Sequence, residues 1–194
     1  MNKCIQQMRE YASLHQVPII TDEGLHFLEE YIKKHSVKKI LEIGTAIGYS
    51  AICMASIDKD IFVTTIERDE NRYLEAIKNI HEAFLDERIH VIYHDALDVE
   101  LVDQYDLIFI DAAKAQNKNF FEKFEVYLKD HGTIITDNMN FHGLTDLDEK
   151  NISSRNLRQL VRKVKKYKEF LIQNKKYDTV FYDVGDGLAV SVKK

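Results

Sequence analysis

The sequence has 194 residues, of which 45% are hydrophobic and 30% are charged. This is the balance of a globular domain in water, and the length suits one domain with a sizeable core. The formal net charge of −5 argues against a protein that coats nucleic acid over its whole surface. No apolar run approaches the roughly 18 residues of a membrane span, and the first residues lack the apolar segment of a secretory signal.

Two helices are predicted at the start of the chain, over residues 4–15 and 22–35, and Thr21 is the expected N-cap of the second. Cys4 and Cys53 lie far apart and match no metal or redox spacing. We therefore expect two reduced thiols in a cytoplasmic protein.

Five short apolar runs, at residues 39–43, 61–66, 89–93, 105–110 and 133–136, follow these helices. Nearly continuous apolar runs are typical of strands that are buried on both faces of a parallel sheet. The segments between them carry helical periods, with Tyr73, Ile77, Ile80 and Phe84 on one predicted face and Phe120, Phe121, Phe124 and Leu128 on another. Alternating strands and helices predict a doubly wound α/β sheet.

The end of the chain departs from this alternation. A long helix is predicted from about residue 153 to 173, followed by strands at 178–184 and 188–192 on either side of Gly185-Asp186-Gly187. Asp-Gly between apolar runs is a hairpin signal, so the parallel sheet should finish with an antiparallel edge. We treat residues 1–194 as one domain, with N-terminal helices over 1–36 and a Rossmann-like core over 37–194.

Three weak signals at the ends of successive predicted strands indicate an adenosyl ligand. Gly44 and Gly48 allow a tight turn after the first strand, in a Gly-x-x-x-Gly spacing that differs from the dinucleotide pattern. Glu67 ends the second strand, where a carboxylate can accept both ribose hydroxyls. Asp95 and Ala96 follow the third strand, placed to meet an adenine. Glu67 alone would be an ordinary solvated strand-end carboxylate.

Oxygen ligands follow the next two predicted strands. Asp111 comes directly after one, and Asp137 with Asn138 directly after the other. Two carboxylates and an amide suit Mg²⁺ or another divalent cation, although either aspartate alone would be a common strand-end cap. Lys114, three residues after Asp111, could reach an acceptor hydroxyl as base or charge stabiliser; most lysines are merely solvated.

The predicted helix before the hairpin is strongly basic. Nine basic residues and one acidic residue, Glu169, lie between positions 155 and 176. An apolar stripe of Leu157, Leu160, Val161, Val164 and Leu171 should face the sheet, and a basic stripe should face outward, formed by Arg155, Arg158, Arg162, Lys165 and Lys166. The charge fits either an anionic partner or a solvated helix face.

Four motifs together resemble the cation-dependent O-methyltransferases, a group that includes catechol and caffeoyl-CoA O-methyltransferases. They occupy residues 40–51, 106–114, 136–138 and 184–188, and the resemblance runs from about Thr21 to Val192. It is closest to a bacterial branch that methylates 5-hydroxyuridine at the tRNA wobble position, in the segments 17–19 and 45–48. The chain lacks the longer N-terminal and inserted segments of the plant enzymes, which argues against a bulky CoA ester.

The resemblance implies a class I methyltransferase fold, S-adenosylmethionine and a divalent cation as cofactors, the tRNA anticodon loop as partner, and a homodimer. It implies cofactor contacts at Glu42, Gly44, Ser50, Glu67 and Asp95, to which we add Ala96 and Asp111. It also implies cation ligands at Asp111, Asp137 and Asn138, and catalysis by Lys114 with Asp111.

Two other hypotheses stay open at this stage. The first is the same reaction on a small catechol-like molecule, for which the basic helix has no use. The second is a non-catalytic adenosyl-binding protein or an NAD-binding Rossmann protein. The glycine spacing and the Asp111, Asp137 and Asn138 set speak against it, and so does the C-terminal hairpin.

Overall fold

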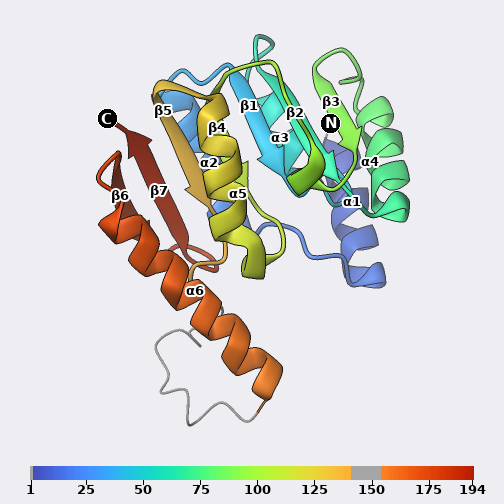
Figure 1. The fold of residues 1–194 in the computed structure, drawn as a ribbon. Helices are drawn as coiled ribbons and strands as arrows, with labels where there is room; N and C mark the ends of the chain where they lie inside the picture. The colour runs from blue at the N-terminus through green and yellow to red at the C-terminus, as the bar shows by residue number, and fades with distance from the viewer. Residues whose placement is uncertain (1, 141–153) are drawn as a thin grey trace.

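The computed structural model describes residues 2–140 and 154–194, and these form a seven-stranded sheet with helices on both faces (Figure 1). The strand order is β3-β2-β1-β4-β5-β7-β6. The parallel strands are β1 (Lys39–Ile43), β2 (Phe62–Glu67), β3 (Ile89–Tyr93), β4 (Tyr105–Ile110) and β5 (Leu128–Thr136). The antiparallel strands are β6 (Tyr177–Tyr182) and β7 (Leu188–Lys193). This confirms the predicted α/β class with a C-terminal antiparallel hairpin.

The helices are α1 (Asn2–His15), α2 (Asp22–Lys34), α3 (Tyr49–Ser56), α4 (Glu70–Glu82), α5 (Asn117–Phe124) and α6 (Arg155–Gln173). Short 3-10 turns η1 (Ala96–Asp98), η2 (Lys114–Gln116) and η3 (Glu125–Tyr127) complete the set. The Thr21 hydroxyl accepts from Gly24 N at 3.1 Å, which confirms the predicted N-cap of α2. Among the described helices, none combines the length and the apolar character that a membrane crossing needs.

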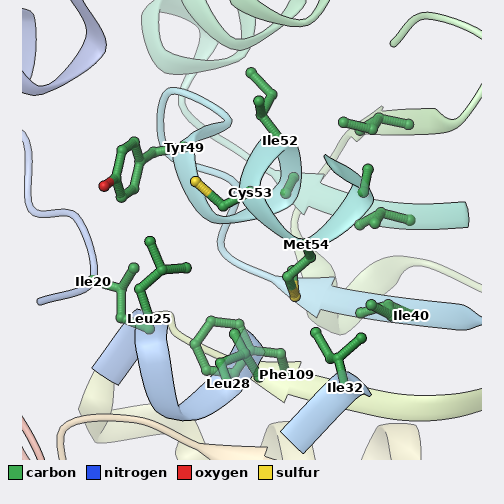
Figure 2. Close-up of a cluster of buried hydrophobic side chains, with 14 of the residues drawn as sticks. Ile20, Leu25, Leu28, Ile32, Ile40, Tyr49, Ile52, Cys53, Met54 and Phe109 are labelled. Atoms are coloured by element: carbon green, nitrogen blue, oxygen red, sulfur yellow. The ribbon is translucent and has the colours of Figure 1, made fainter. Parts of the chain in front are cut away.

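The core consists of two hydrophobic clusters, one on each face of the sheet. Side chains alternate between them along a strand: Leu107 and Phe109 of β4 belong to one cluster, and Ile108 and Ile110 to the other. Figure 2 shows the first cluster, where residues of α2 and α3 meet Ile40 of β1 and Phe109 of β4. Burial on both faces explains why the strands read as continuous apolar runs.

Two sequence predictions about apolar faces were wrong. Phe84 does not lie on the buried face of α4, because the helix ends at Glu82 and Phe84 has a φ of +58° and is 90% exposed. Ile80 is buried as predicted, together with Ala76, whereas Ile77 is exposed. Leu128 is buried as expected, but it begins β5 and is not part of α5.

The bounds predicted for the other strands and for the N-terminal helices agree with the structure to within two residues, except that β5 begins at Leu128 and not at residue 133. The basic helix, α6, begins at Arg155, with the Ser154 hydroxyl accepting from Leu157 N. Residue 153, where its start was predicted, lies outside the described residues.

Candidate active site

A cavity of about 540 Å³ lies at the carboxyl ends of the parallel strands. It is lined by all the residues predicted for the cofactor, the cation or catalysis except Glu42, namely Gly44, Ser50, Glu67, Asp95, Ala96, Asp111, Lys114, Asp137 and Asn138. Parallel strands end at one edge of the sheet, so residues far apart in the sequence converge there.

The turn after β1 passes very close to the end of β4. Gly44 has a φ of +102°, and a Cβ at this position would lie 2.3 Å from the carbonyl oxygen of Asp111. Only glycine tolerates both the left-handed conformation and this approach. The amide of Asp111 in turn donates to Ile43 O at 3.0 Å. The turn and the first acidic residue of the site therefore form one rigid unit.

Glu67, at the end of β2, holds the same turn from the other side. One carboxylate oxygen accepts from Ala46 N at 2.9 Å, and the other accepts from Arg68 N and Asp69 N, also at 2.9 Å. The side chain is only 7% exposed. These backbone donors fix the carboxylate at the cavity wall, where it is available to ribose hydroxyls.

Glu42 lies behind the cavity wall and does not line it. It is fully buried, and its carboxylate accepts from Ser50 Oγ at 2.5 Å and from Thr65 Oγ1 at 2.6 Å. Burial raises the pKa of Glu42 to about 7; the two hydroxyl hydrogen bonds work against this shift. In this geometry Glu42 is linked to the cavity directly through Ser50 and indirectly through Thr65 and Thr45. Its predicted role as a cofactor contact stays a prediction.

Asp95 begins the 3-10 turn η1 and borders the cavity beside Ala96. Its carboxylate accepts from Leu97 N at 3.0 Å and pairs with Arg68 at 3.2 Å. The hydrogen bond from Leu97 and the Arg68 charge hold the pKa of Asp95 below its usual range. Ala96 is buried. Asp95 and Ala96 together thus present a fixed polar group and an apolar surface to the cavity, a combination suited to the edge and face of a base.

Asp111 and Asp137 directly follow the neighbouring strands β4 and β5; Asp137 is buried and Asp111 is half-buried. Asn138 Nδ2 donates to Asp111 Oδ1 at 3.1 Å, and the amide of Asn138 donates to Asp137 Oδ1 at 2.6 Å. Burial, followed by the neighbouring carboxylates, raises the pKa of each aspartate to about 7. The structure therefore brings the three predicted cation ligands together.

The donor set fits a hard divalent cation. No three His, Cys, Asp or Glu side chains within residues 2–140 and 154–194 are arranged to hold a metal ion, so a cation at this site would need the Asn138 amide as its third protein ligand. Carboxylate and amide oxygens are the ligands that Mg²⁺ takes, with further positions left for water or substrate. Lys114, at the start of η2, lines the same cavity, and burial lowers the pKa of its amine.

Asp186 is a site residue that the sequence analysis missed. It lies in the turn between β6 and β7, lines the cavity, and is the acid that most favours the charged form of Lys114. The turn is held in place because Asn140 N donates to Asp186 O at 2.8 Å. We interpreted Gly185-Asp186-Gly187 as a hairpin signal and as part of a family motif, and gave Asp186 no role; a carboxylate between two glycines of a close-packed turn was the available clue.

The segment between α1 and α2 was also missed as part of the site. Pro18, Ile19, Ile20 and Thr21 line the cavity. A Cβ on Gly185 would lie 2.3 Å from Thr21 Oγ1, so this segment and the hairpin turn touch each other. No local pattern in the sequence predicts such a contact.

The basic helix α6 has the two predicted stripes. Val161, Val164 and Leu171 are buried, whereas Leu157 and Leu160 are half-buried. In the basic stripe Arg155, Arg162 and Lys166 are exposed, and Arg158 and Lys165 are half-buried. None of these five described side chains lines the cavity. Figure 1 shows the N-terminal part of α6 extending beyond the body of the molecule.

Comparison with known proteins identifies the family. The O-methyltransferase family model matches residues 1–194. The chain belongs to this family. A catechol O-methyltransferase of Niastella koreensis is 30% identical to this O-methyltransferase over 196 residues, covering 94% of this chain and 85% of the relative.

Solved structures agree with this assignment. A Staphylococcus aureus protein, provisionally named a caffeoyl-CoA O-methyltransferase, has 44% identity and a TM-score of 0.93, covering 98% of this chain and 92% of that one. A Bacillus cereus O-methyltransferase in complex with S-adenosylhomocysteine, at 24% identity and a TM-score of 0.84, covers 99% of this chain and 91% of its own and shares the fold. This O-methyltransferase is therefore an S-adenosylmethionine-dependent enzyme of the caffeoyl-CoA/catechol type.

Proposed function

We propose that this O-methyltransferase requires a divalent cation, held by Asp111, Asp137 and Asn138, and that Lys114 handles the proton of the acceptor hydroxyl. The observation that carries the proposal is the meeting of two carboxylates, one buried and one half-buried, with an amide in the cavity that Gly44, Ser50 and Glu67 also line. When bound, a cation of this kind lowers the pKa of a coordinated hydroxyl and orients it.

The residues of the chain divide the reaction between them. Glu67, Asp95 and Ala96 hold the nucleoside of S-adenosylmethionine, and Ser50 holds its amino-acid portion. An acceptor oxygen attacks the methyl group in line: the new O–C bond forms, the C–S bond breaks, and its electron pair goes to sulfur. The acceptor's proton leaves to Lys114, whose lowered pKa favours the neutral amine that can take it.

The cation requirement can be tested by comparing two carboxylate substitutions, one in the site and one in strand β5 away from it. Asp137→Ala should abolish turnover and weaken Mn²⁺ binding measured by isothermal titration. Asp130→Ala, which removes an exposed carboxylate from the same strand β5, should do neither. Near-parental melting curves would show that both variants fold. Full activity of the parent protein in excess chelator would refute the cation requirement.

We propose 5-hydroxyuridine at the tRNA wobble position as the acceptor. Its 5-hydroxyl and neighbouring 4-carbonyl can occupy two cation positions, and a base in a single-stranded loop can be splayed into a cavity without breaking a duplex. The basic stripe of α6 supports this acceptor, since a run of cations with Glu169 as the one acid in the helix suits a phosphate backbone.

The acceptor is tested by incubating the enzyme with S-adenosylmethionine, Mg²⁺ and tRNA that lacks the modification, followed by nucleoside mass analysis. Arg158→Glu with Arg162→Glu should raise KM for tRNA and flatten its salt dependence. The control, Lys33→Glu with Lys34→Glu on α2, makes the same change in net charge at exposed positions. It should leave KM for tRNA and the salt dependence of KM unchanged.

A small catechol-like acceptor is the second candidate, and the similarity to the Niastella koreensis catechol O-methyltransferase favours it. This candidate predicts that a free catechol is methylated rapidly and that the α6 substitutions do not change the rate. Parental behaviour of the Arg158 and Arg162 double variant towards tRNA at every salt concentration would favour this candidate over tRNA.

A further inference from the structure

We propose that Arg9, on α1, is a positioning residue for the methyl donor: it fixes Tyr49 and the segment 18–21, two parts of the cavity wall that lie far apart in the sequence. The inference rests on the proposed placement of S-adenosylmethionine in this cavity. Arg9 itself does not line the cavity, so it acts through the residues that it holds.

Arg9 binds two partners with the two sides of its guanidinium. Its Nε donates to the hydroxyl of Tyr49 at 2.8 Å. Its Nη1 donates to Asp22 Oδ2 at 3.1 Å, and Nη2 lies 2.5 Å from Asp22 Oδ1. A planar fork with donors in fixed directions sets the relative position of its partners more tightly than a lysine can. Arg9 thereby joins α1 to the starts of α2 and α3.

The Tyr49 side chain lies between two cavities. It lines the donor cavity and also a second cavity of about 560 Å³, which Arg9, Asp22 and Cys53 border as well. The ring itself is only 2% exposed and packs in the first hydrophobic cluster, while its hydroxyl reaches out of that cluster to Arg9. Figure 2 shows its hydroxyl directed away from the hydrophobic cluster. The hydrogen bond from Arg9 therefore fixes the hydroxyl end of this packed ring, and Ser50 follows Tyr49 directly in the chain.

Asp22 is the second partner of Arg9, and through it Arg9 holds the segment 18–21. It is the first residue of α2 and follows Thr21, the N-cap, whose preceding residues Pro18, Ile19 and Ile20 line the cavity. By holding Asp22, Arg9 fixes the end of this segment against α1. One side chain, Arg9, thus links Tyr49 on α3 to the segment 18–21. These two parts of the cavity wall are positioned relative to each other through Arg9.

An ordinary ion pair between helices would make a different prediction. The Arg9 and Asp22 side chains are 40% and 69% exposed, and a pair with that exposure contributes little to stability. If Arg9 only joined helices, its removal would lower the melting temperature slightly and leave donor binding unchanged. If it positions the wall, donor binding weakens more than stability does.

The test is direct binding of S-adenosylmethionine to the protein without added cation or acceptor, by calorimetry and stopped-flow dissociation. Arg9→Gln should raise Kd about tenfold, mainly through faster dissociation, as loss of a hydrogen bond from a charged group implies. Arg9→Lys should fall between the parent and Arg9→Gln. Lys3→Gln, which removes an exposed charge from the same helix, should bind like the parent. In turnover, KM for the donor should rise while kcat stays close to the parental value.

Tyr49→Phe provides the second variant, because it keeps the ring and removes only the acceptor of the hydrogen bond. Its effect should be smaller than that of Arg9→Gln, and the double variant should be no worse than Arg9→Gln alone, since the two substitutions break the same contact. A folded Arg9→Gln protein with the parental Kd and dissociation rate overturns the inference, as do additive effects of the two substitutions. Neither outcome bears on the cation or on tRNA, whose tests are separate.

Discussion

Replacing Glu42 by glutamine should make the protein more stable at pH 8 and change its stability little at pH 5. The physical cause is the buried carboxyl group. Its pKa is about 7 in the folded chain against a reference value of 4.5, because burial disfavours the charged form. Between these two values the folded chain holds a proton that the unfolded chain has released. The free energy of unfolding therefore falls as pH rises through this window.

The size of the effect follows from the shift. A difference of about 2.5 pH units at about 1.4 kcal/mol per unit amounts to about 3.5 kcal/mol, nearly all of it present at pH 8 and about a quarter of it at pH 5. Glutamine stays neutral throughout and has the same shape. Its carbonyl can accept from one of the two hydroxyls of Ser50 and Thr65, and its amide can donate to the other.

The assay is urea unfolding at pH 5, 6, 7 and 8 without cofactor, with the difference between variant and parent plotted against pH. Titrating groups that do not interact with Glu42 cancel in the difference. Asp111, whose pKa is raised by burial and then by Glu42, does not cancel, and relief of this repulsion adds to the stabilisation at high pH. Glu87→Gln, at an exposed position, is the control and should give a flat line near zero. A flat line for Glu42→Gln, or a variant less stable than the parent at pH 8, would refute the reasoning.

Three other substitutions test separate parts of the structure. Glu67→Ala should weaken S-adenosylmethionine binding by about tenfold or more, since buried polar groups lose their partner; an unchanged Kd in calorimetry would remove Glu67 from the site. Gly44→Ala should cost about 2–4 kcal/mol in urea unfolding, because its Cβ would lie 2.3 Å from the Asp111 carbonyl oxygen; parental stability would contradict this. Phe121→Ala should cost about 3–5 kcal/mol, since the ring is fully buried in edge contacts with Tyr167, Phe170 and Tyr177. Phe84→Ala, at a 90% exposed ring, is its control.

The features that could be predicted from the sequence are those that local chemistry determines. The runs at β1 and β4 identified strands buried on both faces, whereas β3, at the edge of the sheet, is only partly buried. The polar residues that follow the parallel strands had to meet at one edge of the sheet. This is why Asp111 and Asp137 were predicted together although 26 positions separate them. Their convergence needed only the fold class.

The features that could not be predicted depend on long-range packing. Arg9 and Tyr49 are 40 residues apart and join helices whose relative position no local pattern encodes. Asp186 reaches the cavity only because its turn docks on Asn140. Phe84 follows the helical spacing of α4 but lies beyond the end of the helix, which a periodicity argument cannot detect. Glu42 has the residue type of a ligand contact, and only the three-dimensional structure places it behind Ser50.

The strand order at the C-terminal end of the sheet constrains how this enzyme folds. β7 follows β6 in the chain but lies between β6 and β5, so β6 has no place to attach until β7 is present. Either the two strands pair first and join β5 as a ribbon, or β7 docks on β5 and β6 follows; in both cases β6 joins the sheet no earlier than β7. Because Asp186 lies in the turn of that ribbon, the acidic end of the cavity closes in a late step of folding. An intermediate with β1 to β5 assembled would already have the donor turn and Glu67, and would expose the apolar edge of β5 to aggregation until the ribbon docks.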